Sequence, residues 1–247
     1  MFFVVAHLNL MNGLHKFKGF ALIVDNNYPG HRGQILFGFP VMITTIAKKS
    51  YDKKSIISSI EKNFKLNKKR NLWDKISVLH HAYKDFSNPK YHKVNFKTLI
   101  PIYEKTLTRL FEKMAFNSSS TVPHFDFLII NYTCLAKSNY MAAHLHPGVD
   151  FTAVHYIQFD HKHHKPTIFE NTLPHVEHIN ELRPELTQIL SHDHPANSWA
   201  YKNWILDVEE DDFCLSPAFL KHRIDPQDSK KKNRITIVLN ISLKRKP

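Results

Sequence analysis

MAAHLHPGVDFTAVHYI, residues 141–157, is the stretch from which the fold of this chain can be read. Its second half continues as FTAVHYIQFD, 151–160, which is rich in β-branched and aromatic residues and predicts a β-strand. On an extended strand, residues two positions apart point to the same side. His144 and His146 can therefore both face the interior of a barrel, and Pro147-Gly148 then turns the chain. Two imidazoles on one face indicate a candidate metal site that needs a further ligand from elsewhere.

Other short, turn-bounded segments surround this stretch and predict a sandwich or barrel. They are FDFLIINY at 125–132, NYMAAHLH at 139–146, PTIFEN at 166–171, NWILDV at 203–208, FCLSP at 213–217 and RITIVLNISL at 234–243. Upstream, ILFGFPVMITTI at 35–46 predicts a strand interrupted at Pro40. Residues 174–200 do not show this pattern of short strands separated by turns, so we expect a His-containing insertion or lid there.

Two amphipathic helices are predicted before the strand-rich region. In residues 48–70, four apolar residues share one helical face and Lys and Arg occupy the other: Ile56, Ile57, Ile60 and Phe64. In residues 95–116, apolar residues recur at steps of three and four: Phe96, Leu99, Ile100, Tyr103, Leu107, Leu110, Phe111 and Met114. The polar run NSSSTVP, 117–123, should end the second helix.

The 247 residues carry a formal net charge of +12, and the charge is unevenly distributed. Residues 1–117 contain 20 Lys and Arg against 7 Asp and Glu, whereas residues 118–247 contain 14 against 15. The region from Lys48 to Arg70 alone holds nine basic and two acidic residues, so nucleic-acid binding there is an alternative to a solvated helix face. Aromatic residues for base stacking are sparse in this region, which weakens that alternative.

Composition excludes several classes of protein. Only six glycines occur, and neither GxGxxG nor GxxxxGK[ST] is present, which disfavours a nucleotide-binding fold. The two cysteines exclude a disulfide framework and favour a reducing, cytoplasmic setting. No apolar run reaches about 18 residues, so no membrane span is expected. The start MFFVVAHLNLM, residues 1–11, lacks the basic segment and cleavage site of a signal peptide.

His222, in SPAFLKHRI at 216–224, is the candidate for the third metal ligand. In a double-stranded β-helix, ligands from an early and a late strand converge on one face of a metal ion, as in the facial triad of non-haem Fe(II) oxygenases. Arg234 opens the last predicted strand, and its planar guanidinium matches a carboxylate. Thr236 lies two residues further on the same face and can add a hydroxyl.

These motifs resemble the 2-oxoglutarate/Fe(II)-dependent oxygenases, in particular a group with phage and bacterial members that carries an HxHP motif. The similar strings are HLHPGVDFTAVHYIQ at 144–158, FCLSPAFLKHRIDP at 213–226, NRITIVLNIS at 233–242, ILFGFPVMI at 35–43 and VLHHAYKDFSNP at 78–89. The resemblance implies a mainly β protein of the α+β class, with N-terminal helices packed against a double-stranded β-helix (jelly-roll, cupin-like) core.

The resemblance also implies roles for individual residues. His144 and His222 would bind Fe(II), and Arg234 with Thr236 would hold the distal carboxylate of 2-oxoglutarate. Asn131 and Tyr132, on the preceding strand, occupy positions where such enzymes often contact the cosubstrate. The third ligand is commonly Asp or Glu, whereas this chain has His146. His146 is preferred on geometry, and Asp150 is the alternative. No catalytic residue is predicted outside the metal site.

The predicted activity is that of a dioxygenase that consumes 2-oxoglutarate and O2 and hydroxylates an unidentified peptidyl residue or small molecule. Residues 35–247 would form one oxygenase domain, with a strand and basic helical support in 35–123 and the β-helix in 124–247. Residues 1–34 would be an extension. Two alternatives stay open: a cupin-type metal dioxygenase or isomerase without 2-oxoglutarate, and a basic nucleic-acid-binding protein with a barrel scaffold.

Overall fold

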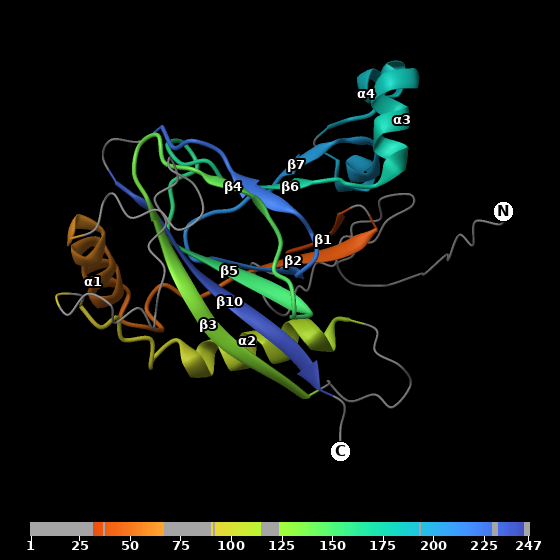
Figure 1. Cartoon of the computed structure of the whole chain (residues 1–247). Coiled ribbons are helices and arrows are strands. Elements are labelled where there is room, and N and C mark those ends of the chain that lie inside the picture. Colours follow the sequence, from red (N-terminus) through yellow and green to blue (C-terminus); the bar gives the residue numbers. More distant parts are fainter. Residues whose placement is uncertain are drawn as a thin grey trace.

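The computed structural model describes residues 32–36, 38–66, 90, 92–114, 124–192, 194–228 and 232–244 (Figure 1). In chain order the elements are β1 (Arg32–Leu36), β2 (Phe39–Thr45), α1 (Lys53–Leu66), α2 (Ile100–Glu112), β3 (His124–Leu135), β4 (Met141–His144), β5 (Phe151–Gln158), β6 (Thr167–Glu170), α3 (Pro174–Leu182), α4 (Pro184–Ile189), the 3-10 helix η1 (Pro195–Ala200), β7 (Asn203–Ile205), β8 (Asp212–Pro217), β9 (His222–Ile224) and β10 (Arg234–Lys244).

The described strands form two antiparallel sheets. One has six strands in the order β1-β2-β8-β5-β10-β3, and the other has four in the order β4-β9-β6-β7. A buried apolar cluster joins Tyr156 of β5 and Cys214 of β8 to Phe169 of β6 and Trp204 of β7. Because these side chains come from both sheets, the sheets pack face to face. The prediction of a mainly β protein is confirmed, and its paired strands are antiparallel.

The six-stranded sheet buries both of its faces. Along β10, Ile235, Ile237, Leu239 and Ile241 belong to a cluster with apolar residues of α1 and α2. Alternate residues of a strand point to opposite sides. Arg234, Thr236 and Asn240 therefore face the four-stranded sheet, and this inner face carries the candidate site.

The two helices pack as their apolar spacing predicts, but the second is shorter than predicted. In α1, Ile56, Ile60 and Phe64 are buried. The second helix starts at Ile100 rather than at residue 95, because Pro101 suits only the first turn of a helix. Ile100 is 42% exposed, so it does not join the buried face.

The strand predicted at 35–46 is two strands. β1 and β2 pair antiparallel, with Leu36 opposite Phe39, and the chain turns at Gly38 with φ +85°. Glycine adopts this left-handed conformation without a steric penalty. Pro40 lies inside β2, so the predicted interruption at Pro40 is wrong. Its missing N–H is tolerated because β2 pairs with β8 only from Met42 onward.

The insertion at 174–200 is helical and projects from the sheets as α3 and α4 (Figure 1). The short strand β9 was not predicted, and β7 ends at Ile205 rather than at residue 208. Residues 1–31, the VLHHAYKDFSNP string at 78–89 and the breaker at 117–123 lie outside the described residues. In the part that is described, no helix is both long enough and apolar enough to cross a membrane.

Candidate metal centre

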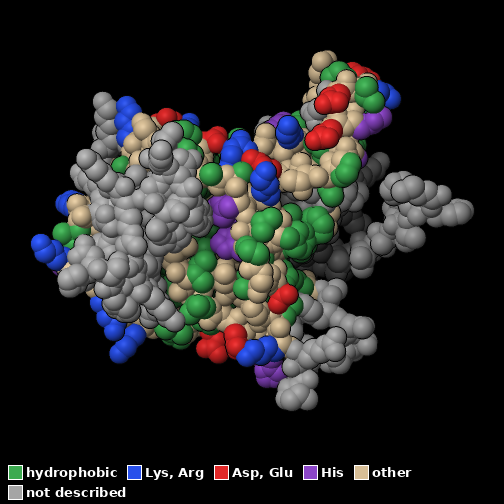
Figure 2. Space-filling model, viewed as in Figure 1, with side chains coloured by type: hydrophobic (Ala, Val, Ile, Leu, Met, Phe, Trp, Pro, Cys, Tyr) green, Lys and Arg blue, Asp and Glu red, His purple; other side chains and the backbone are tan. Residues whose placement is uncertain are grey.

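Three histidines from two neighbouring strands converge at one end of the four-stranded sheet. His144 is the last residue of β4, His146 follows it by two positions, and His222 is the first residue of β9. His144 and His222 lie opposite each other in the sheet register. One ligand nitrogen from each ring lies within 4.8 Å of the other two. His side chains are visible near the centre of the face shown in Figure 2, beside a group of hydrophobic side chains.

Each ring is oriented by a hydrogen bond from its Nδ1 atom to an oxygen. His144 donates to the Ala142 carbonyl at 2.8 Å, and His222 donates to the Leu220 carbonyl at 2.9 Å. The third ring, His146, lies 2.9 Å from the side-chain oxygen of Asn240 on β10. An oxygen acceptor keeps the proton on Nδ1, so the lone pair of each ring is on Nε2. Metal-binding histidines are commonly held in this way.

Burial keeps the three imidazoles in the form that binds a metal ion. Desolvation lowers the pKa of His144 and of His146 below the usual value, and it lowers the pKa of His222 to about 3. The mutual repulsion of the rings, if charged, acts in the same direction for His222. Neutral imidazole is the ligand form, because a protonated ring has no lone pair to donate. The three residues therefore suit a divalent transition metal.

A buried cation lies on the same inner face. Arg234 is fully buried, and its Nε and Nη1 atoms have no hydrogen-bond partner among the described residues. Its Nη2 atom is 3.5 Å from the hydroxyl of Thr167 on β6, and its guanidinium carbon is 5.1 Å from the ring centre of Tyr156. Burial lowers the pKa of Arg234, but a guanidinium stays charged in proteins. An uncompensated buried charge costs several kcal/mol, on the order of 3–5.

Polar side chains from the neighbouring strand β3 accompany Arg234. Thr133 lies opposite Thr236 in the register, and their hydroxyl oxygens are 2.5 Å apart. Asn131 lies opposite Val238, and its Oδ1 atom is also buried with no partner among the described residues. The unpartnered groups of Arg234 and Asn131 thus face the space between the sheets. Buried groups of this kind are usually satisfied by ordered water, an ion or a polar ligand.

Two residues that the sequence offered as candidates for this site, Tyr132 and Asp150, do not lie in it. Tyr132 points to the helix side, where its hydroxyl accepts a 2.9 Å hydrogen bond from Asn63 of α1, so pairing it with Asn131 was wrong. The carboxylate of Asp150 accepts a hydrogen bond from the Leu243 backbone at 2.8 Å. Among the described residues, the group that could hold a metal ion contains His146 and not Asp150.

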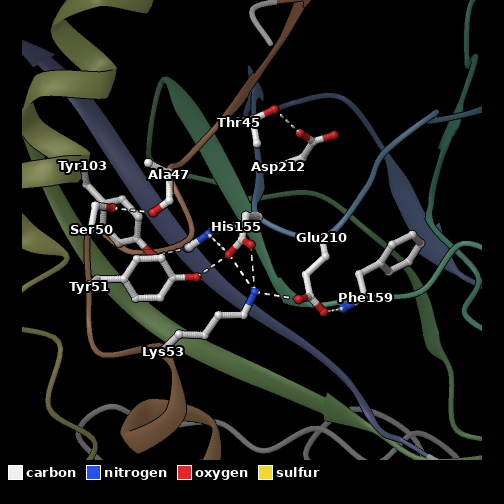
Figure 3. Close-up of polar contacts among 11 residues, drawn as sticks. Thr45, Ala47, Ser50, Tyr51, Lys53, Tyr103, His155, Phe159, Glu210 and Asp212 are labelled. Carbon is white, nitrogen blue, oxygen red and sulfur yellow. Dashed lines mark hydrogen bonds and ion pairs between the residues drawn. The ribbon is translucent and has the colours of Figure 1, made fainter. Parts of the chain in front are cut away.

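A second polar cluster lies on the face of the six-stranded sheet that packs against the helices, opposite the inner face (Figure 3). The buried carboxylate of Asp211 accepts hydrogen bonds from the Tyr51 hydroxyl at 2.5 Å and from the Lys53 ammonium at 2.8 Å. His155 lies 3.9 Å from Asp211, and its Nδ1 atom is 2.9 Å from the Tyr103 hydroxyl. These contacts tie α1 and α2 to the sheet, so the cluster has a structural explanation.

Asn240 is the site residue that the sequence analysis missed. It lies six positions after Arg234 on the same strand, and the two-residue period places both on one face. The two-residue period could have predicted its position, because Asn240 is a polar residue in an otherwise apolar strand and shares a face with Arg234.

The basic region from Lys48 to Arg70 is described only as far as Leu66. Lys48, Lys49 and Lys54 are exposed. Nucleic-acid binding through this region stays a prediction, since nothing in the described residues tests it.

No family model and no curated protein matches the sequence. Solved structures with partial similarity include a 2OG-Fe(II) oxygenase family member from Burkholderia pseudomallei, with a TM-score of 0.33 and 10% identity over 58% of this chain and 59% of that one. A prolyl hydroxylase from Trichoplax adhaerens, in complex with a peptide fragment of the hypoxia inducible factor oxygen degradation domain, has a TM-score of 0.46 and 10% identity over 81% and 83%. A prolyl-4-hydroxylase from Pseudomonas putida has a TM-score of 0.40 and 9% identity over 83% and 93%.

Proposed function

We propose that the chain is an Fe(II)- and 2-oxoglutarate-dependent oxygenase with a double-stranded β-helix core, and that it hydroxylates a substrate with release of succinate and CO2. The three-histidine cluster alone suits several transition metals, because imidazole binds Zn, Cu, Fe and Ni. The observation that carries the proposal is the buried, incompletely paired guanidinium of Arg234 on the same inner face.

Arg234 has the chemistry to bind one end of 2-oxoglutarate. Its planar guanidinium can hold a carboxylate with two parallel hydrogen bonds, from Nε with Nη2 or from Nη1 with Nη2. Nε and Nη1 are the atoms still without a partner among the described residues. The ring of Tyr156 and the apolar side chain of Phe159 lie beside the guanidinium and exclude water from it. Electrostatic attraction is stronger where water is excluded, so a carboxylate there would offset the cost of burying the arginine.

His144, His146 and His222 would hold the iron through their Nε2 atoms. Bound there, Fe(II) would supply open coordination positions for the keto-acid end of 2-oxoglutarate and for O2, which is the chemistry of oxidative decarboxylation. The protein contributes no anionic ligand, since all three side chains are neutral. The two negative charges of 2-oxoglutarate would therefore meet a divalent ion at one end and the Arg234 cation at the other.

A visible absorption titration under anaerobic conditions tests this proposal. Addition of Fe(II) followed by 2-oxoglutarate is expected to produce a charge-transfer band, and subsequent exposure to O2 should give succinate. We expect His222→Ala to abolish Fe(II) binding, whereas Arg234→Ala should weaken 2-oxoglutarate binding and leave Fe(II) binding intact. The matched control is Arg223→Ala, because Arg223 is half-buried and its guanidinium contacts Glu170 and Asp225. Absence of the band from the wild-type protein would contradict the proposal.

A further inference from the structure

The outer edge of β3 is open among the described residues. β3 is twelve residues long and lies at the end of the six-stranded sheet, where its other edge pairs with β10 from Leu135 to His124. No described residue pairs with the backbone on the outer side. A long, apolar edge strand with unpaired N–H and C=O groups is a template for another extended chain.

A groove with a volume of about 730 Å³ runs along this edge at residues 125–130. Its lining also includes Val149 and Asn240, and Asn240 is the residue whose side chain contacts His146. One end of the groove therefore adjoins the candidate metal centre. Six strand residues span about 20 Å, so the groove is long enough for a short peptide segment.

The groove lining favours a polypeptide over a nucleic acid. Leu128 is 49% exposed. It lies opposite Asn240 in the register, so its side chain is on the same face of the sheet as the candidate metal centre. The charged side chains of the described lining are Glu104 and Asp126, and Asp126 is paired with Lys244. Glu104 adds a negative charge and the described lining itself contains no cation, which disfavours phosphates. An exposed apolar side chain beside free backbone groups fits β-strand addition, in which the backbone gives affinity and side-chain contacts give specificity.

We propose that the primary substrate is an extended polypeptide segment that pairs with the outer edge of β3 over residues 125–130 and so reaches the histidine cluster. The inference rests on the proposed function for its chemistry and adds the class of substrate. Backbone hydrogen bonds to β3 would provide most of the affinity, and contacts with Leu128 and its neighbours would select side chains. The Glu104 carboxylate in the lining predicts a preference for neutral or basic segments.

Retention of peptides on the immobilised full-length protein tests whether the peptide binds along β3. The probe is a pool of ten-residue peptides with random residues at every position. Leu128→Glu is expected to lower retention at least about tenfold, because a carboxylate would be desolvated against the bound segment. Leu182→Glu is the matched control, since Leu182 is 65% exposed on α3, and it should retain peptides as the wild type does. Equal retention by both variants would overturn the proposal.

N-methylation of a retained peptide tests the pairing itself. In a strand, successive N–H groups point to opposite sides. Methylation at one alternating set of positions should therefore abolish binding, whereas methylation at the other set should be tolerated. Hydrogen exchange should slow at backbone amides within 125–130 when the unmodified peptide binds. A peptide that tolerates both sets, or that protects a different segment, would contradict strand pairing.

Succinate formation separates this inference from the proposed function. Succinate formed from 2-oxoglutarate and Fe(II) without peptide supports the oxygenase activity, and a retained peptide should increase the rate. Succinate formation without any peptide retention would overturn the strand-pairing inference alone. Retention that depends on Leu128, without succinate under any condition, would support the peptide site and contradict the oxygenase activity.

Discussion

The side-chain oxygen of Asn240 lies 2.9 Å from Nδ1 of His146, so this ring is oriented by a side chain from the opposite sheet. His144 and His222 instead use backbone carbonyls two residues before them. His146 is therefore the candidate ligand whose ring orientation can be disturbed by a substitution elsewhere, at Asn240. It is also the candidate ligand at the position where a carboxylate is common in facial triads.

Asn240→Leu is expected to weaken metal binding about 10- to 100-fold, because the Nδ1 proton of His146 would lose its acceptor and the ring its orientation. Titration with Co(II), followed by visible absorption, measures the affinity. Ser242→Ala is the control, since Ser242 is the next residue of β10 on the same face and lies opposite Asp126. Unchanged Co(II) affinity in Asn240→Leu would show that Asn240 does not position the ring.

Arg234→Met is expected to stabilise the ligand-free protein and to abolish the response to 2-oxoglutarate. The substitution removes a fully buried cation whose Nε and Nη1 atoms lack described partners and keeps an apolar side chain of similar length. Replacing buried charges by apolar groups often gains about 1–4 kcal/mol. Thermal unfolding should thus show a Tm raised by about 2–4 °C per kcal/mol gained. Added 2-oxoglutarate with Fe(II) should raise the Tm of the wild type only.

The free energy of unfolding of the metal-free protein is expected to fall as the pH is lowered from about 6.5 toward 3. Burial lowers the pKa of His155 and of His222 to about 3, whereas an unfolded chain protonates histidine near 6.5. In that interval the unfolded state binds more protons, so acid favours unfolding. Each of these imidazoles contributes a slope of at most about 1.4 kcal/mol per pH unit.

Denaturant titrations at several pH values measure this slope. His155→Asn removes one of the rings whose pKa is lowered to about 3, so the loss of stability per pH unit should be smaller than in the wild type. An identical slope in the two proteins would show that His155 is not a source of the acid sensitivity.

Asp211→Asn is expected to destabilise the protein by about 3–5 kcal/mol, because the Lys53 ammonium would lose its fully buried partner. Asp211 also has φ +73°, which asparagine tolerates as well as aspartate does, so the backbone contributes little to the difference. Urea unfolding measures the effect. Glu210→Gln is the control, since Glu210 is more exposed and should cost about 1 kcal/mol or less. Similar losses in both variants would contradict this assignment.

The sequence predicts the parts of the site that depend on strand periodicity. The spacing of His144 and His146 correctly predicted that their ligand atoms meet, and the spacing of Arg234 and Thr236 correctly predicted a shared face. The same period should have excluded Tyr132, because adjacent residues of one strand cannot both face the inner side. The resemblance placed the pair by position and overlooked that constraint.

Other features depend on tertiary contacts and could not be predicted locally. β9 has only three residues and contains Arg223, so its composition carries no strand signal, and its pairing with β4 and β6 defines it. The full burial of Arg234 requires the second sheet to cover it. The contact between Asn240 and His146 joins residues 94 positions apart. The described residues do not test the predicted domain boundaries or the role of residues 1–34.

The register between β3 and β10 shifts between Val238 and Leu239, whose partners are Asn131 and Ile129. Ile130 is therefore an extra residue, and it reverses the phase of β3. Even-numbered residues such as Leu128 face the inner side before it, and odd-numbered residues such as Asn131 do so after it. An alignment of this strand with a relative that lacks the bulge must therefore allow a one-residue gap at Ile130. Without that gap, the alignment would equate inner residues with helix-facing ones in one half of the strand.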